Sequence, residues 1–395
     1  MKFYKIIFSV ITALMVMSSC ANDGSLGYSV TEPDSLAVLD YLKAYKPLKS
    51  YIDTVATPNF KLGVGIAVSD FNSEAVLYRL YCSNFNNVTA GYEMKEGSVV
   101  QSDGSLDTTD VVTFLKNTEK AGMSVYGHNL VWHANQNATY LNKLIASSVT
   151  SDEKNQILTT EMERYIKGMM TACKPYVYAW DVVNEPMADY PDPSQLKTGV
   201  GQTLTSDEFF WQDYLGKDYA VKAFKFAREY GNTNDKLFIN EYGLEGTSQA
   251  KLTGLINYIN YIENQGATVD GIGTQMHLTV ATADTTAIVE MFKKLATTGK
   301  LIKISELDIG IADGVLTSAV TDAQLQTQAK LYNFVARAYF KYVPAAQRYG
   351  ITIWSPLDSP KTSSWRGGEP IGLWTLQYDR KRAYAGFADG LAGKY

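Results

Sequence analysis

Cysteine and histidine are scarce in this chain of 395 residues, with three of each. Apart from Cys20, the cysteines are Cys82 and Cys173, so the body of the chain forms one disulfide or keeps two buried thiols. The chain also lacks an excess of basic residues, because its formal net charge is -5 and its isoelectric point is near 5.4. Nucleic-acid binders usually carry a basic face, so we expect no nucleic-acid partner.

Long apolar runs are almost absent, and the one exception lies at the N-terminus. Lys2 and Lys5 precede the apolar run 6–17, which is shorter than a membrane span and is typical of a signal peptide. The run ends in Met17-Ser-Ser-Cys20, which resembles a bacterial lipobox and implies lipidation of Cys20 after cleavage. Ordinary secretion with cleavage nearby is the alternative.

The rest of the chain shows no internal repeat and no Pro/Ser-rich linker. With 46% hydrophobic residues it can bury a large core, and an elaborated barrel of about 250 residues or more is a single domain. We therefore predict a signal peptide at 1–20, an N-terminal tether at 21–40 and one catalytic domain at 41–395.

Strand-like and helix-like segments alternate eight times along this body. Such alternation indicates a parallel sheet, and eight units indicate closure into a (β/α)8 TIM barrel of the α/β class. Thr150 with Glu153, and Thr321 with Gln324, form possible capping boxes of two of the helices. The predicted strands are 62–68, 84–89, 124–132, 176–184, 236–240, 271–277, 301–306 and 350–354.

Unusual polar and aromatic residues gather where these strands end. Glu185 follows the fourth strand and Glu306 ends the seventh. In a parallel barrel the carboxyl ends of all strands meet at one rim, where the active site is built. All three histidines fall at or near the C-terminal ends of predicted strands, and five of the six tryptophans lie in these strands or in the loop after the eighth.

A metal centre is the competing use of the histidines. His128 and His133 are five residues apart, which places them on opposite faces of a continuing strand. No His-Glu-x-x-His helix and no Cys/His cluster accompanies them. The sequence therefore does not favour zinc hydrolysis, and no metal or organic cofactor is implied.

Five strings resemble glycoside hydrolase family 10, the endo-β-1,4-xylanases, in family order between about residues 85 and 384. This resemblance implies a (β/α)8 barrel that hydrolyses a xylan-type substrate with retention of configuration. The strings are His128-Asn-Leu-Val-Trp-His133, Trp180-Asp-Val-Val-Asn-Glu185, Gly271-Ile-Gly-Thr-Gln-Met-His277, Ser305-Glu-Leu-Asp308 and Ile351-Thr-Ile-Trp354.

By the same resemblance, Glu185 is the general acid/base and Glu306 is the nucleophile. A retaining glycosidase needs such a pair of carboxyl groups about 5–5.5 Å apart. Negative charge on Glu306 is expected to keep Glu185 protonated until the glycosyl ester forms.

The resemblance also implies the residues that bind the sugar at the cleavage point. Asn184 corresponds to the residue that contacts the sugar 2-hydroxyl, and His277 to the one that orients the nucleophile, with Asp308 behind it. For each of these residues the alternative is a structural role, as a buried polar or aromatic side chain that closes the barrel mouth. For Asp308 and for Trp374 the functional and the structural interpretations are evenly balanced. The remaining substrate-binding candidates are Lys95, His128, Trp132, Gln275, Trp354 and Trp365.

The chain departs from the family pattern after the second strand. The family usually has Glu-Asn-x-Met-Lys there, whereas this chain has Gly91-Tyr-Glu-Met-Lys95. The two missing polar residues normally bind the sugar one unit beyond the cleavage point on the glycone side. We expect that subsite to be weakened, or reshaped for a different or decorated sugar.

The sequence predicts a retaining endo-β-1,4-xylanase whose partner is xylan or xylo-oligosaccharides. Two alternatives stay open, a retaining hydrolase of another or modified β-glycan and a surface glycan-binding lipoprotein. We expect a monomer, exported and lipid-anchored at the bacterial cell envelope, with membrane contact only through the anchor.

Overall fold

The computed structural model describes residues 38–394. The chain divides into two compact units, 1–43 and 44–395, and the barrel belongs to the second. The predicted signal peptide with Cys20 and most of the predicted tether lie outside the described residues, so those boundaries stay predictions. No helix within residues 38–394 is long and apolar enough to cross a membrane.

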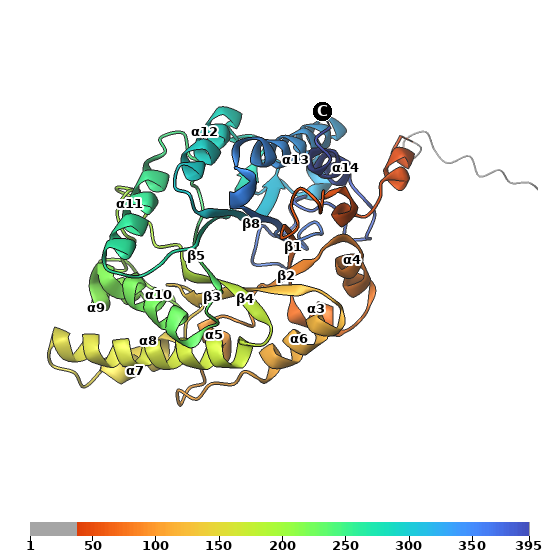
Figure 1. The fold of residues 1–395 in the computed structure, drawn as a ribbon. Coiled ribbons are helices and arrows are strands. Elements are labelled where there is room, and N and C mark those ends of the chain that lie inside the picture. Colours follow the sequence, from red (N-terminus) through yellow and green to blue (C-terminus); the bar gives the residue numbers. More distant parts are fainter. Residues whose placement is uncertain (1–37, 395) are drawn as a thin grey trace, which may run out of the picture. The chain divides into compact units, whose positions relative to one another are not determined.

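Within the described residues, eight parallel strands close into a barrel through the pairings β6–β8 and β9–β1, and helices surround it (Figure 1). The short strand β7 pairs with the C-terminal half of β8. This closed sheet confirms the predicted (β/α)8 barrel. The strands are β1 (Lys61–Ile66), β2 (Asn87–Ala90), β3 (Ser124–Val131), β4 (Val177–Asn184), β5 (Lys236–Glu241), β6 (Gly271–Thr274), β7 (His277–Thr279), β8 (Leu301–Gly310) and β9 (Arg348–Ile353).

Both predicted capping boxes are confirmed, at the start of the two long helices α8 and α13. Short 3-10 helices lie at Asp40–Ala44, Leu48–Tyr51, Gly216–Asp218, Thr317–Ala319 and Ala345–Gln347. The α-helices are α3 (Val68–Asn72), α4 (Val76–Asn84), α5 (Glu96–Val99), α6 (Thr109–Lys120), α7 (Ala138–Ile145), α8 (Ser151–Cys173), α9 (Trp211–Leu215), α10 (Tyr219–Tyr230), α11 (Ala250–Asn264), α12 (Thr285–Ala296), α13 (Asp322–Tyr342) and α14 (Arg382–Leu391).

Side chains inside the barrel change from apolar to polar along the strands. Tyr126, Phe238 and Tyr349 pack together, with ring centroids 4.8–6.0 Å apart. Because side chains on a strand alternate between faces, the residues two positions further on, His128 and Asn240, point to the same side. The aromatic layer is thus a floor beneath the polar rim.

Two predicted strands were wrong in detail. Asn84 does not begin a strand but ends helix α4, where its side-chain amide donates to the carbonyl of Leu80. The predicted run 271–277 is broken, because Met276 has a φ of +58° and separates β6 from β7. Cys82 and Cys173, the two cysteines in the described residues, are both free thiols. The disulfide alternative was therefore wrong.

Candidate active site

Glu185 stands directly after β4, in a left-handed backbone conformation with φ of +52°. Its backbone amide donates to the carbonyl of Asn240 on β5 at 2.8 Å, which fixes the turn to the neighbouring strand. Its carboxylate accepts hydrogen bonds from Trp132 Nε1 at 2.9 Å, Gln275 Nε2 at 3.0 Å and Asn184 Nδ2 at 3.3 Å. Three donors from three different strand ends therefore aim this carboxylate.

Glu306 lies within β8 and is buried, with an exposed fraction of 6%. Its Oε1 accepts from Asn240 Nδ2 at 2.8 Å, and its Oε2 is 3.5 Å from His277 Nε2. Burial alone would raise the pKa of Glu306, but the hydrogen bond from His277 and the charges of His128, His277 and Lys95 outweigh it and lower the pKa to about 2. The carboxylate is therefore ionised at neutral pH.

Asn240 connects the two carboxylates through its side-chain amide. Its Nδ2 donates both to Glu306 Oε1 and, at 2.9 Å, to Asn184 Oδ1, while Asn184 Nδ2 reaches Glu185. Ser305 Oγ donates to Asn240 Oδ1 at 2.6 Å, which fixes the orientation of the amide. Asn240 was not among the predicted site residues, although it is a polar residue at the end of the predicted fifth strand.

His277 and Asp308 form a second chain of contacts behind Glu306. His277 Nδ1 is 2.9 Å from Asp308 Oδ2, and Asp308 also accepts from Trp365 Nε1 at 2.8 Å and Arg366 Nη1 at 2.6 Å. Burial lowers the pKa of His277, but Asp308 and Glu306 raise it more, to about 10. His277 is therefore an imidazolium at neutral pH and donates to Glu306.

His128 and Lys95 are two further groups whose electrostatic effect lowers the pKa of Glu306. His128 Nδ1 is 2.9 Å from Asp181 Oδ2, and Asp181 Oδ1 accepts from Tyr126 at 2.6 Å. Lys95 is buried, with its ammonium 4.6 Å from the centre of the Trp132 ring. Burial lowers the pKa of Lys95, against the pull of the nearby carboxylates. Asp181 was not predicted as a site residue, although a charged residue inside an otherwise apolar strand indicates a functional or paired group.

The structure thus brings together the predicted catalytic and substrate-binding residues, whereas Trp374 and His133 lie apart from them. Trp354 packs edge-on against His128 at 5.8 Å, and Trp365 lies 4.5 Å from the His277 ring. Trp374 is buried and packs against Tyr384 at 4.9 Å, so it belongs to the core. Cys20 is outside the described residues.

His133 is also separate from the carboxylates. Its ring stacks on Phe210 at 4.9 Å, and burial, with the nearby charge of Lys197, lowers its pKa to about 3. A neutral stacked imidazole is a packing residue. The described residues contain no group of three His, Cys, Asp or Glu side chains arranged to hold a metal ion.

A buried, ionised carboxylate and a second carboxylate held by neutral donors, at the C-terminal rim of a (β/α)8 barrel, define a two-carboxylate glycosidase. The family model for glycosyl hydrolase family 10 matches residues 51–390. The chain belongs to this family.

Curated relatives of this chain are described as xylanases. An endo-1,4-beta-xylanase of Agaricus bisporus is 30% identical over 87% of this chain and 91% of its own length. Endo-beta-1,4-xylanase Xyn10C of Cellvibrio japonicus is 28% identical over 89% of this chain. This chain spans only 59% of the length of that relative.

Solved structures share the fold. Xylanase B from Clostridium stercorarium F9 superposes with a TM-score of 0.76 at 22% identity, covering 87% of this chain and 100% of that one. A mutant of xylanase 10C from Cellvibrio japonicus, in complex with xylopentaose, gives a TM-score of 0.73 at 24% identity, covering 86% of this chain and 69% of that one.

Proposed function

We propose that this chain is a retaining endo-β-1,4-xylanase that hydrolyses internal bonds of xylan. The observation that carries the proposal is the continuous path of side-chain hydrogen bonds from Glu306 through Asn240 and Asn184 to Glu185. It fixes an ionised nucleophile and an acid/base candidate in one rigid arrangement, which is what double displacement at a glycosidic bond requires. The xylanases among its relatives support xylan as the polymer.

The first step joins the sugar to the enzyme. A carboxylate oxygen of Glu306 attacks the anomeric carbon while the bond from that carbon to the leaving oxygen breaks, and Glu185 transfers its proton to the leaving oxygen. The product is a glycosyl ester on Glu306. Asn240 Nδ2 and His277 Nε2 contact the attacking carboxylate and hold it at a fixed angle.

The second step releases the sugar with its original configuration. Water attacks the anomeric carbon from the side that the leaving group vacated, Glu185 accepts a proton from the water, and the ester bond to Glu306 breaks. Both carboxylates return to their starting states. Gln275 and Trp132 keep Glu185 in place through both proton transfers.

The proposed roles of the other rim residues follow from what they present to a sugar. The buried Lys95 ammonium, which feels the charges of both carboxylates, and the Asn184 amide, which donates to Glu185, would bind ring hydroxyls. Trp354 and Trp365 would cover the apolar faces of the sugar. Arg366 and Asp308 act indirectly, by fixing Trp365 and His277.

A hydrolase of another or modified β-glycan is the second candidate, because Gly91 and Tyr92 stand where the family usually has two polar residues. We would incubate the wild type and Glu306→Ala with a panel of plain and decorated xylans, mixed-linkage glucan and cellulose, and follow product size with time. Xylo-oligosaccharides of several lengths, released at least ~10⁴-fold more slowly by the variant, are the expected result. Cleavage of a different polymer alone would replace xylan as the substrate, and binding without cleavage would favour a glycan-binding lipoprotein.

We also propose that the chain is exported and lipid-anchored through Cys20 as a monomer at the cell envelope. The short apolar run 6–17 after two lysines, and the lipobox-like Met17-Ser-Ser-Cys20, support this. The wild type should label with a fatty acid and sediment with membranes, and Cys20→Ala should do neither, whereas Cys82→Ala should behave as the wild type. Equal labelling of all three would refute the anchor, and light scattering of the soluble chain tests the monomer.

A further inference from the structure

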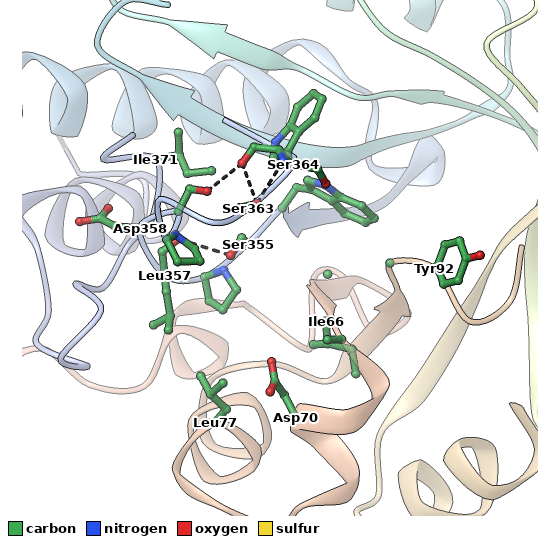
Figure 2. A pocket seen from close by; sticks show the side chains of 18 of the residues that line it. Ile66, Asp70, Leu77, Tyr92, Ser355, Leu357, Asp358, Ser363, Ser364 and Ile371 are labelled. Atoms are coloured by element: carbon green, nitrogen blue, oxygen red, sulfur yellow. Dashed lines mark hydrogen bonds between the residues drawn. The ribbon is translucent and has the colours of Figure 1, made fainter. Parts of the chain in front are cut away.

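A pocket of about 570 Å³ opens beside the two rim tryptophans. It lies between the loops that follow β1 and β2 and the long loop after β9 (Figure 2). This volume is within the ~300–1,000 Å³ of typical small-molecule sites. Leu77, Tyr81 and Leu376 are among its apolar lining residues.

The pocket adjoins the candidate active site through two shared side chains. Trp354 and Trp365 line it, and the same two side chains pack against His128 and His277. Trp365 is also hydrogen-bonded to Asp308, so one wall of the pocket is fixed by the catalytic arrangement. A group attached to a sugar next to the cleaved bond would therefore reach the pocket without a separate binding event.

The mouth of the pocket is open because residue 91 has no side chain. Gly91 and Tyr92 line the pocket, and a Cβ placed on Gly91 would meet only the Ile66 carbonyl, at 3.3 Å. Tyr92 is 49% exposed and lies at the edge of the view in Figure 2. Gly91, at a position where the family usually has a polar side chain, therefore leaves space beside the substrate.

The charge of the lining is negative. Asp70 and Glu93 both line the pocket, and no lysine or arginine is among the described residues that do so. Figure 2 shows the Asp70 carboxylate directed into the pocket. Burial and the charge of Glu93 raise the pKa of Asp70.

The other acidic groups nearby are already paired. Asp358 lines the pocket, but Lys381 Nζ lies 2.5 Å from its Oδ1, and Figure 2 shows its carboxylate directed away. Both oxygens of Glu93 accept from backbone amides, Oε1 from Val68 at 3.1 Å and Oε2 from Tyr92 at 3.4 Å. Asp70, by contrast, has no side-chain hydrogen bond among residues 38–394, so its two oxygens are available to ligand hydroxyl groups.

We propose that this pocket binds an uncharged sugar branch on the xylan main chain, and that Asp70 and Glu93 exclude a branch that carries a carboxylate. Carboxylates accept hydrogen bonds from sugar hydroxyls, whereas a uronic acid would place like charges together in a partly buried space. The inference rests on the proposed xylanase function and names the class of decorated substrate.

The test compares three xylo-oligosaccharides of equal main-chain length: linear, with one arabinofuranosyl branch, and with one glucuronosyl branch. For the wild type we expect kcat/KM at least about tenfold higher with the neutral branch than with the acidic branch. The double variant Asp70→Asn, Glu93→Gln should narrow this ratio about tenfold, chiefly by improving the acidic substrate. Gly91→Glu should lower kcat/KM on the substrate with the neutral branch relative to kcat/KM on the linear substrate. Glu290→Gln, at an exposed ion pair on α12, is the matched control and should leave both ratios unchanged.

Calorimetric binding of the same oligosaccharides to Glu306→Ala reports on the pocket without catalysis. If linear xylo-oligosaccharides are cleaved but the ratios do not respond to Asp70 and Glu93, the pocket inference is wrong and the xylanase proposal stands. If no xylo-oligosaccharide is cleaved or bound, both are wrong.

Discussion

At the scale of single residues, the two carboxylates differ because their neighbours differ. Glu306 is surrounded by cationic and donor groups, and its pKa is about 2. Glu185 is held by the neutral donors of Trp132 and Gln275. In the proposed mechanism, two groups of the same chemistry thereby take different tasks, Glu306 as the nucleophile and Glu185 as the proton donor. Asn240 contacts Glu306 directly and reaches Glu185 through Asn184, so a change there affects both tasks.

Asn240→Asp replaces the amide that donates to Glu306 by a carboxylate at about the same place. The loss of a donor and the gain of a like charge both raise the pKa of Glu306. We expect the acidic limb of the kcat/KM profile to move upward by at least about one pH unit, with lower activity at neutral pH. Asn264→Asp, at the end of α11 and away from the rim, should leave the profile unchanged. An unshifted limb in a folded Asn240→Asp protein would contradict the role given to Asn240.

Glu185→Gln keeps the shape of the side chain and an oxygen that accepts from Trp132, but it cannot transfer a proton. We expect kcat/KM on xylan to fall about 10²–10⁴-fold. With an aryl xyloside, whose leaving group departs without protonation, formation of the glycosyl ester should fall much less, and burst kinetics would separate the two steps. Equal losses on both substrates would argue that Glu185 is a positioning group.

At the scale of the elements, alternation and helix caps were predictable, while departures from ideal strands were not. The eight strand positions and both capping boxes follow from local patterns of apolar residues and Ser/Thr/Glu signals. The break at Met276 depends on a left-handed residue between β6 and β7, which no local pattern showed. Asp181 and Asn240 were missed for a related reason, because their function arises only from side chains on adjacent strands.

The capping boxes lead to a stability prediction. Thr150 and Thr321 each accept a backbone hydrogen bond at the start of a helix of more than twenty residues. Thr150→Ala and Thr321→Ala should each lower the free energy of unfolding by about 1 kcal/mol, measured by chemical denaturation, with unchanged kcat. Thr160 and Thr327 are exposed within the same helices and bond only to the preceding turn, so their alanine variants should lose no stability. Equal losses at caps and interior positions would refute the capping account.

At the scale of the whole molecule, the ionisable groups of the site make the stability of the fold depend on pH. Buried charges at the barrel rim stabilise the folded chain only while each keeps its protonation state. His277 has a folded-state pKa of about 10, above the ordinary 6.5, so its contribution is present below pH 6.5 and disappears as the pH rises through 10. Glu306 has the opposite sign, because its contribution is present above its ordinary pKa of 4.5 and disappears as the pH falls toward 2.

His277→Gln should therefore be most destabilising at pH 6 and progressively less so up to pH 10. Denaturation of wild type and variant at stepped pH measures this difference, and the imidazole resonances of His277 should titrate near pH 10 in the folded wild type. His133 is the contrast, since its pKa is lowered to about 3 and it is neutral in the folded state throughout this range. The difference between wild type and His133→Gln should therefore stay constant from pH 7 to pH 10. If the His277→Gln difference is also constant there, His277 is neutral in the folded protein and cannot be the cation that keeps Glu306 ionised.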